Sequence, residues 1–177
     1  EQQVQVIVQM IHKGINAPLT SSLGRLFDAV AAILGMHPTV AFEGQAAMAL
    51  EHIAVKGAVD PYAFAWTDGE PKVVDTGDII RCVVEDALAG TPPAVIAARF
   101  HETLIQGFTR LCDEIRRDTG HKRVALSGGV FQNVRLLDGL LHRLTAAGFS
   151  VHAHTQVPTN DGGLSLGQAV AAAAMMS

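Results

Sequence analysis

Apolar residues recur at helical spacing through the first two thirds of the chain. The opening stretch shows the pattern at i, i+3, i+4 and i+7, with the residues Val4, Ile7, Val8 and Ile11. This spacing predicts an amphipathic helix that ends at Gly14. The same periodicity, bounded by capping residues and by Gly or Pro, predicts further helices at about 22–34, 45–55, 76–89 and 93–118. Residues 57–75 are rich in Gly, Pro and Asp and predict loops that could include a minor hairpin.

The last third of the chain alternates between strand and helix patterns. Short apolar runs predict strands at 123–126 and 151–155, and residues 164–175 predict a final helix. Between the strands, residues 131–147 predict a helix whose inward positions are Val134, Leu137, Leu140, Leu141 and Leu144. Because two strands joined by a crossover helix lie parallel, the pattern predicts a helix-rich α/β fold with a small, mostly parallel sheet.

Glycine-containing turns follow both predicted strands. In a parallel sheet these turns emerge at the same edge, where open α/β sheets bind their ligands. The residues gathered there would be Gly128, Gly129, Asn133, Asn160, Asp161 and Gly162. Backbone N–H groups at helix starts favour an anion, so the edge predicts a site for a phosphate or another oxyanion. Taken singly, each residue also has a structural interpretation: Gly128 and Gly129 as a tight turn, and Asp161 as a helix N-cap.

Ser21, Arg25 and Asp28 form a polar stripe on the second predicted helix. One interpretation is an exposed Arg–Asp pair on a hydrated helix surface, which contributes a few tenths of a kcal/mol. The other is that Asp28 accepts hydrogen bonds from the hydroxyls of a ligand such as a ribose. The position on the helix leaves both interpretations open.

The histidines give weaker signals. His152 and His154 share one face of a predicted strand, but no Cys or acidic residue stands at zinc-ligand spacing from them. His101, beside Phe100 on an apolar helix, is predicted to be a hydrogen-bonded core residue. Ser127 lacks the GxSxG context, so no Ser-His-Asp set is predicted.

Composition limits the function classes. Of the 177 residues, 49% are hydrophobic and 17% are charged, which predicts one folded domain or large subdomain with a genuine core. The net charge of −4 argues against a nucleic-acid partner, because such proteins need clustered Lys and Arg. No apolar run approaches the roughly 20 residues that span a bilayer, and we expect no signal peptide, because Glu1, Gln2 and Gln3 stand where its basic segment would be. Cys82 and Cys112 lack zinc-site spacing. We expect a cytoplasmic protein that binds no membrane.

Five sequence blocks carry a family resemblance. They are NAPLTSSLGRLFDAVAA at 16–32, FEGQAA at 42–47, ARFH at 98–101, LSGGVFQN at 126–133 and PTNDGGLSLGQ at 158–168. In this order the blocks resemble the HypF carbamoyltransferases of nickel–iron hydrogenase maturation. The resemblance covers nearly the whole chain.

The resemblance implies a multidomain enzyme whose last domain has the actin/sugar-kinase-like (ribonuclease H-like) ATPase fold. That domain passes a carbamoyl group from carbamoyl-adenylate to the C-terminal cysteine of HypE. Residues 1–177 are then expected to be a single subdomain, the second lobe, with the upstream lobe and the N-terminal domains of the same protein outside this sequence. Such a lobe is expected to bind nucleotide weakly and to turn nothing over alone.

The resemblance also implies roles for single residues. Asp28 would bind the ribose of ATP or AMP, with Glu43 and Gly44 beside the sugar. The phosphate side would be held by Gly128, Gly129 and Asn133. Asp161 would ligate a divalent metal (zinc, iron or magnesium) whose other ligands lie outside this chain.

Two alternatives remain. The related TsaD enzymes, which transfer threonylcarbamoyl to tRNA, usually show Tyr-Pro-Gly-Gly and Thr-Asp-Asn where this chain has FEGQ at 42–45 and NDG at 160–162. These departures favour HypF. The other alternative is a non-catalytic interaction module that docks on HypE or on the missing lobe. A severed lobe would expose an apolar interdomain face, through which a homodimer could form.

Overall fold

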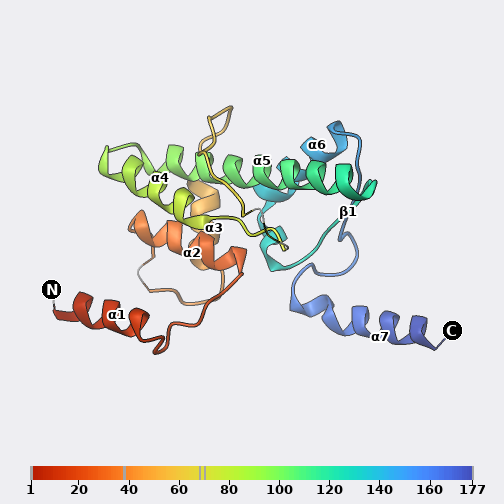
Figure 1. The fold of residues 1–177 in the computed structure, drawn as a ribbon, viewed down its shortest axis with the longest axis horizontal. Helices are drawn as coiled ribbons and strands as arrows, with labels where there is room; N and C mark the ends of the chain where they lie inside the picture. The colour runs from red at the N-terminus through yellow and green to blue at the C-terminus, as the bar shows by residue number, and fades with distance from the viewer. Residues whose placement is uncertain (1, 38, 68, 70, 177) are drawn as a thin grey trace.

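The computed structural model describes residues 2–37, 39–67, 69 and 71–176. These residues form seven α-helices, two 3-10 helices and one two-stranded sheet (Figure 1). The α-helices are α1 (Gln2–His12), α2 (Leu23–Ile33), α3 (Gln45–Ile53), α4 (Thr76–Leu88), α5 (Pro93–Thr119), α6 (Val134–Ala146) and α7 (Leu164–Met175). The strands are β1 (Arg123–Leu126) and β2 (Ser150–Ala153), and the 3-10 helices are η1 (Gly129–Gln132) and η2 (Asp161–Gly163).

The long helix α5 forms the centre of the body and contacts α3, α4 and α6 (Figure 1). It begins with Pro93 at its first position, where the missing N–H costs no helical hydrogen bond. It ends at Thr119 and is capped by Gly120, whose φ of 74° suits glycine. On its buried face Phe100 meets Phe27 of α2 edge to face, with ring centroids 4.9 Å apart. The core therefore lies between α5 and the helices around it.

Helix α6 covers the core with most of the residues predicted to face inward: Leu140 and Leu144 are buried, and Leu137 and Leu141 pack against the core. Its buried residues are Leu136, Leu140 and Leu144, whereas Val134 is 58% exposed. The predicted inward position of Val134 is therefore wrong. The physical reason is that residues 129–132 form the separate turn η1, so α6 begins only at Val134 and its apolar stripe starts two residues later.

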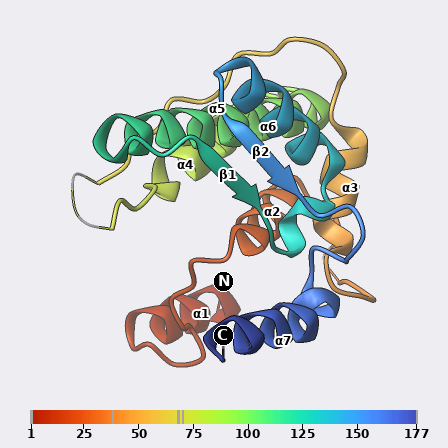
Figure 2. The same cartoon turned by 90° about the vertical axis from the view of Figure 1, so that its right-hand side faces the viewer.

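The sheet confirms the predicted helix-rich α/β class with a small parallel sheet. β1 and β2 are parallel, with Leu126 opposite Ala153, and α6 provides the crossover. The second strand ends at Ala153 rather than at the predicted Thr155. Figure 2 shows both strands running toward η1 and α2. The turns after β1 and β2 therefore leave the sheet at the same edge.

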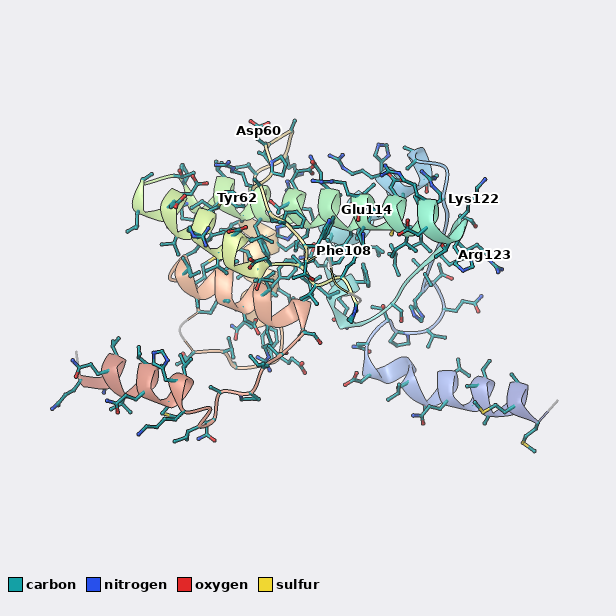
Figure 3. The ribbon with its side chains drawn as sticks, in the orientation of Figure 1. Asp60, Tyr62, Phe108, Glu114, Lys122 and Arg123 are labelled. Atoms are coloured by element: carbon teal, nitrogen blue, oxygen red, sulfur yellow. The ribbon has the colours of Figure 1, made fainter. Side chains whose placement is uncertain are left out.

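The loop between α3 and α4 lies across α5. Trp66 and Val74 form an antiparallel bridge, so the minor hairpin exists, although residues 68 and 70 lie outside the described residues. The Tyr62 hydroxyl donates to Asp86 at 2.7 Å, and Arg99 donates to the same carboxylate at 2.7 Å. Burial first, and then Asp86, raise the pKa of Tyr62. Figure 3 shows Tyr62 over α4 and α5.

Helices α1 and α7 stand apart from the body. Neither has a buried residue, and both project on the same side of it (Figures 1 and 2). Their exposed large apolar side chains are Val4, Val6, Ile7, Val8, Ile11, Leu164, Leu166, Val170 and Met175. Among the described residues, no helix combines the length and apolarity needed to cross a bilayer.

Candidate functional site

The turns that follow β1 and β2 are joined by two hydrogen bonds. The backbone N–H of Gly128 donates to the carbonyl of Thr159 at 3.0 Å, and the Thr159 hydroxyl donates back to the carbonyl of Gly128 at 3.0 Å. Gly128 has a φ of 115°, a backbone conformation that glycine adopts readily and other residues rarely adopt, so this turn requires glycine. We call residues 127–130 and 157–163 together the two-turn rim. The prediction that both turns converge at one edge is confirmed.

Asp161 does not act as the helix cap that the structural interpretation offered. The cap of η2 is Asn160, whose Oδ1 accepts from the N–H of Gly162 at 3.0 Å. Asp161 is the exposed first residue of η2. Its carboxylate is therefore available on the rim.

Asn133 connects the rim to the buried core. Its Oδ1 accepts from the N–H of Leu136 at 2.8 Å and caps α6. Its Nδ2 donates to Nε2 of His101 at 3.0 Å, and His101 Nδ1 lies 2.7 Å from the carbonyl of Ala97. A carbonyl can only accept, so we assign the ring proton to Nδ1 and a lone pair to Nε2. His101 is fully buried, which confirms it as a hydrogen-bonded core residue.

Burial lowers the pKa of His101 to about 4. The hydrogen bond to Ala97 acts in the opposite direction, and the nearby charge of Arg135 lowers the pKa further. His101 is therefore neutral in the folded protein at neutral pH. A second ring proton would also face Asn133 Nδ2, which is a donor.

This burial predicts a pH-dependent stability. The unfolded chain protonates His101 near pH 6.5 and the folded chain only near pH 4, so acid favours the unfolded state in this window. We expect the free energy of unfolding to fall by about 2 kcal/mol between pH 6.5 and pH 5 because of this group. Urea unfolding at several pH values measures the slope. The slope should be reduced in His101→Gln and retained in a variant of the exposed residue, His121→Gln; equal slopes would contradict the assignment.

Asp28 and the FEGQ block lie on elements that adjoin the rim. Helix α2, which carries Asp28, contacts both α3 and η1 (Figure 2). Glu43 is exposed, and Gly44 caps α3 with a φ of 80°. Asp28 also pairs with Arg25 at 3.1 Å, so the predicted Arg–Asp pair is present. The Asp28 side chain is 34% exposed, and its second carboxylate oxygen has no protein partner among the described residues.

The described residues contain no group of three or more His, Cys, Asp or Glu side chains that could hold a metal ion. Within this part of the chain Asp161 offers a single carboxylate, and divalent ions need further ligands. His152 and His154 contact different serines: Nε2 of His152 lies 3.3 Å from Ser150 Oγ, and Nε2 of His154 lies 2.9 Å from Ser127 Oγ.

The contact between Ser127 and His154 is a site feature that the sequence analysis missed. Oγ of Ser127 and Nε2 of His154 are 2.9 Å apart, and both residues are exposed. Each directly follows its strand, and the register that pairs Leu126 with Ala153 places them side by side. The sequence offered little signal, because the predicted strand at 151–155 includes His154 and the register of the two strands is known only from the fold.

One concave surface lies away from the rim. It is lined by the α6 residues Asp138, Leu141, His142, Thr145 and Ala146. None of the candidate residues borders it. It provides a reference surface against which binding at the rim can be judged.

Comparison with known proteins identifies the family. Residues 1–168 match the family model described as carbamoyltransferase, Kae1-like domain, second subdomain. The match and the fold define the class, which is that of the Kae1-like carbamoyltransferase domains. Within this class the chain belongs to the HypF family. This favours the HypF interpretation over the tRNA-modifying alternative.

The relatives are much longer than this chain. It is 38% identical over 157 residues to carbamoyltransferase HypF of Synechocystis, covering 88% of this chain and 20% of that protein. It is 39% identical over 169 residues to carbamoyltransferase HypF of Rhodobacter capsulatus, covering 95% of this chain and 22% of that protein. The chain thus spans about a fifth of the length of these relatives.

A solved structure shows the same fold. The crystal structure of full-length HypF in the phosphate- and nucleotide-bound form matches with a TM-score of 0.96 and 40% identity, over 100% of this chain and 23% of that one. HypF of T. kodakarensis matches with a TM-score of 0.80 and 33% identity, over 94% of this chain and 22% of that one.

Proposed function

We propose that this chain supplies one half of the nucleotide site of a carbamoyltransferase. The whole enzyme would pass a carbamoyl group from carbamoyl-adenylate to the C-terminal cysteine of HypE, on the route to the cyanide ligand of a nickel–iron hydrogenase. The observation that carries the proposal is the pair of hydrogen bonds between Gly128 and Thr159, which unites two turns into one rim. The phosphate- and nucleotide-bound state of the HypF relative supports it.

The roles follow the positions of the residues. Asp28 would accept hydrogen bonds from the ribose, beside Glu43 and Gly44. Gly128 and Gly129 would let the backbone approach the phosphate, and Asn133, which also caps α6, would hold the phosphate side with them. Breaking the acyl–phosphate bond leaves negative charge on AMP, which backbone N–H groups stabilise. A divalent metal held by Asp161 and by ligands outside this chain would add to that stabilisation.

The exposed helices α1 and α7 are an argument for a partner lobe in the whole protein. Both leave apolar side chains exposed that a folded domain would normally cover. We propose that the upstream lobe of the same carbamoyltransferase domain covers them, with a homodimer through the same helices as the alternative. A single lobe is then expected to bind nucleotide weakly and to transfer no carbamoyl group.

The nucleotide site is tested by Asp28→Asn. Losing a charged acceptor for a ribose hydroxyl removes about 1.5–3 kcal/mol, so AMP should bind about tenfold or more weakly. Calorimetric titration with AMP and Mg²⁺ measures this affinity. Folding should hardly change, because exposed ion pairs contribute little to stability.

The chain offers a matched control in Asp78→Asn. Asp78 pairs with Arg81 three residues away on α4, and the exposures of the two side chains, 36% and 67%, nearly equal those of Asp28 and Arg25, 34% and 68%. AMP affinity should be unchanged in the control. Equal affinity in Asp28→Asn and the unmodified chain would contradict the role of Asp28.

A further inference from the structure

We propose that His154, held in place by Ser127, is the general base that takes the proton of the acceptor thiol during carbamoyl transfer. This inference rests on the proposed function and extends it to the step that delivers the carbamoyl group. It is based on the 2.9 Å contact between Ser127 Oγ and His154 Nε2 at the edge of the sheet. A thiol is a poor nucleophile until it loses its proton, so the reaction needs a base close to the scissile bond.

The position of the pair meets this need. Ser127 is the residue before Gly128, whose N–H and carbonyl join the two turns of the rim. His154 follows β2 at the same edge. A phosphate held at Gly128 and Gly129 would place its acyl carbon near both side chains. Both are exposed, so an acceptor approaching from solution could reach them.

The other histidines near the rim do not offer this function. His101 is fully buried and both of its ring nitrogens are occupied, by Ala97 and Asn133. His152 lies two residues further back on β2, where it contacts Ser150. Nδ1 of His154 has no hydrogen-bond partner among the described residues, so one ring nitrogen can take a proton.

The roles of the two atoms follow from this arrangement. With its proton on Nε2, His154 donates to Ser127 Oγ, and the lone pair on Nδ1 faces the incoming group. The thiol proton moves to Nδ1, the sulfur bonds to the carbamoyl carbon, and the bond from that carbon to the phosphate oxygen breaks. AMP leaves with the electron pair, and the imidazolium later releases its proton to water. Ser127 is a positioning residue in this scheme.

The test measures carbamoyl transfer to HypE by the full-length protein of which this chain is a part. His154→Gln keeps a donor for Ser127 but cannot act as a base, so the transfer rate should fall on the order of 10²–10⁴-fold. AMP affinity should stay within about twofold, since the nucleotide contacts are intact. Imidazole added to His154→Ala should restore part of the rate, which a structural role would not allow. Ser127→Ala should lower the rate less, and Ser127→Thr should recover it.

His152→Gln is the matched control, because His152 also contacts a serine, Ser150, but lies inside β2 opposite Ala125 and not at the end of the strand. Its transfer rate should equal that of the unmodified protein. An unchanged rate in His154→Gln would overturn this inference but not the proposed function. An equal loss of rate in His152→Gln would do the same. If the unmodified protein binds AMP but transfers nothing to HypE, the proposed function is contradicted, and the role of His154 is overturned with it.

Discussion

Replacing Asn133 with alanine is expected to lower the free energy of unfolding by about 2–4 kcal/mol. The change removes the cap of α6, a loss of about 1 kcal/mol. It also leaves Nε2 of the fully buried His101 without a donor, at a further 1–3 kcal/mol. Urea unfolding at pH 7 measures the change.

Asn160→Ala provides the control for this prediction. Asn160 also caps a helix, through Oδ1 and the N–H of Gly162 at 3.0 Å, but it is exposed and supports no buried group. Its replacement should lower the free energy of unfolding by about 1 kcal/mol or less. Similar small losses in both variants would show that the bond between Asn133 and His101 contributes little.

The stability role of Asn133 affects how the nucleotide site is tested. Weaker AMP binding by Asn133→Ala would combine a lost ligand contact with a loosened start of α6. Asp28 avoids this ambiguity, because its protein partner is the exposed Arg25. The Asp28 variants therefore test the nucleotide site, and Asn133→Ala tests the hydrogen bonds that hold the start of α6.

Replacing Gly163 with alanine is expected to weaken AMP binding at least 30-fold, or about 2 kcal/mol. A Cβ at Gly163 would lie 2.4 Å from the carbonyl oxygen of Pro158 and 3.0 Å from Cγ1 of Val157. The first contact is with backbone, so the turn at 157–163 must move. That movement would break the bonds between Thr159 and Gly128 and open the rim. Calorimetry with AMP measures the loss.

Gly167→Ala is the control four residues further on. No atom lies within 4 Å of a Cβ at Gly167, which is inside the exposed helix α7. Alanine should stabilise that helix by about 0.5–1 kcal/mol and leave AMP affinity unchanged. Normal AMP binding by Gly163→Ala would show that the second turn takes no part in the site.

Much of the site's framework could be predicted from sequence because it depends on local pattern and one topological rule. A strand, a helix and a second strand imply a parallel pair and a shared edge. The start of the helix between the strands was predicted less well: η1 delays the start of α6, Val134 is exposed, and the buried face begins at Leu136. A glycine-rich turn can join directly to a helix or pass through a short 3-10 turn, and periodicity does not distinguish these.

The supporting contacts of the site could not be predicted, because they join residues far apart in the sequence. The bond between His101 and Asn133 spans 32 positions and depends on how α5 packs against α6. The link from Gly128 to Thr159 spans 31 positions. Ser127 and His154, 27 positions apart, meet through the register of the two strands, which no local pattern specifies. For Asp28 the ion pair and the ribose acceptor are compatible, because one carboxylate oxygen can pair with Arg25 while the other accepts from a ligand.

The central claim is that one nucleotide phosphate binds across both turns of the rim. Titrating the unmodified chain with AMP while following its backbone amide resonances tests this most directly. The amides of Gly128, Gly129, Asn160 and Gly162 should shift together in a single saturable transition. Shifts confined to one turn, shifts at the α6 surface around Asp138 and His142, or no shift at all would contradict the claim.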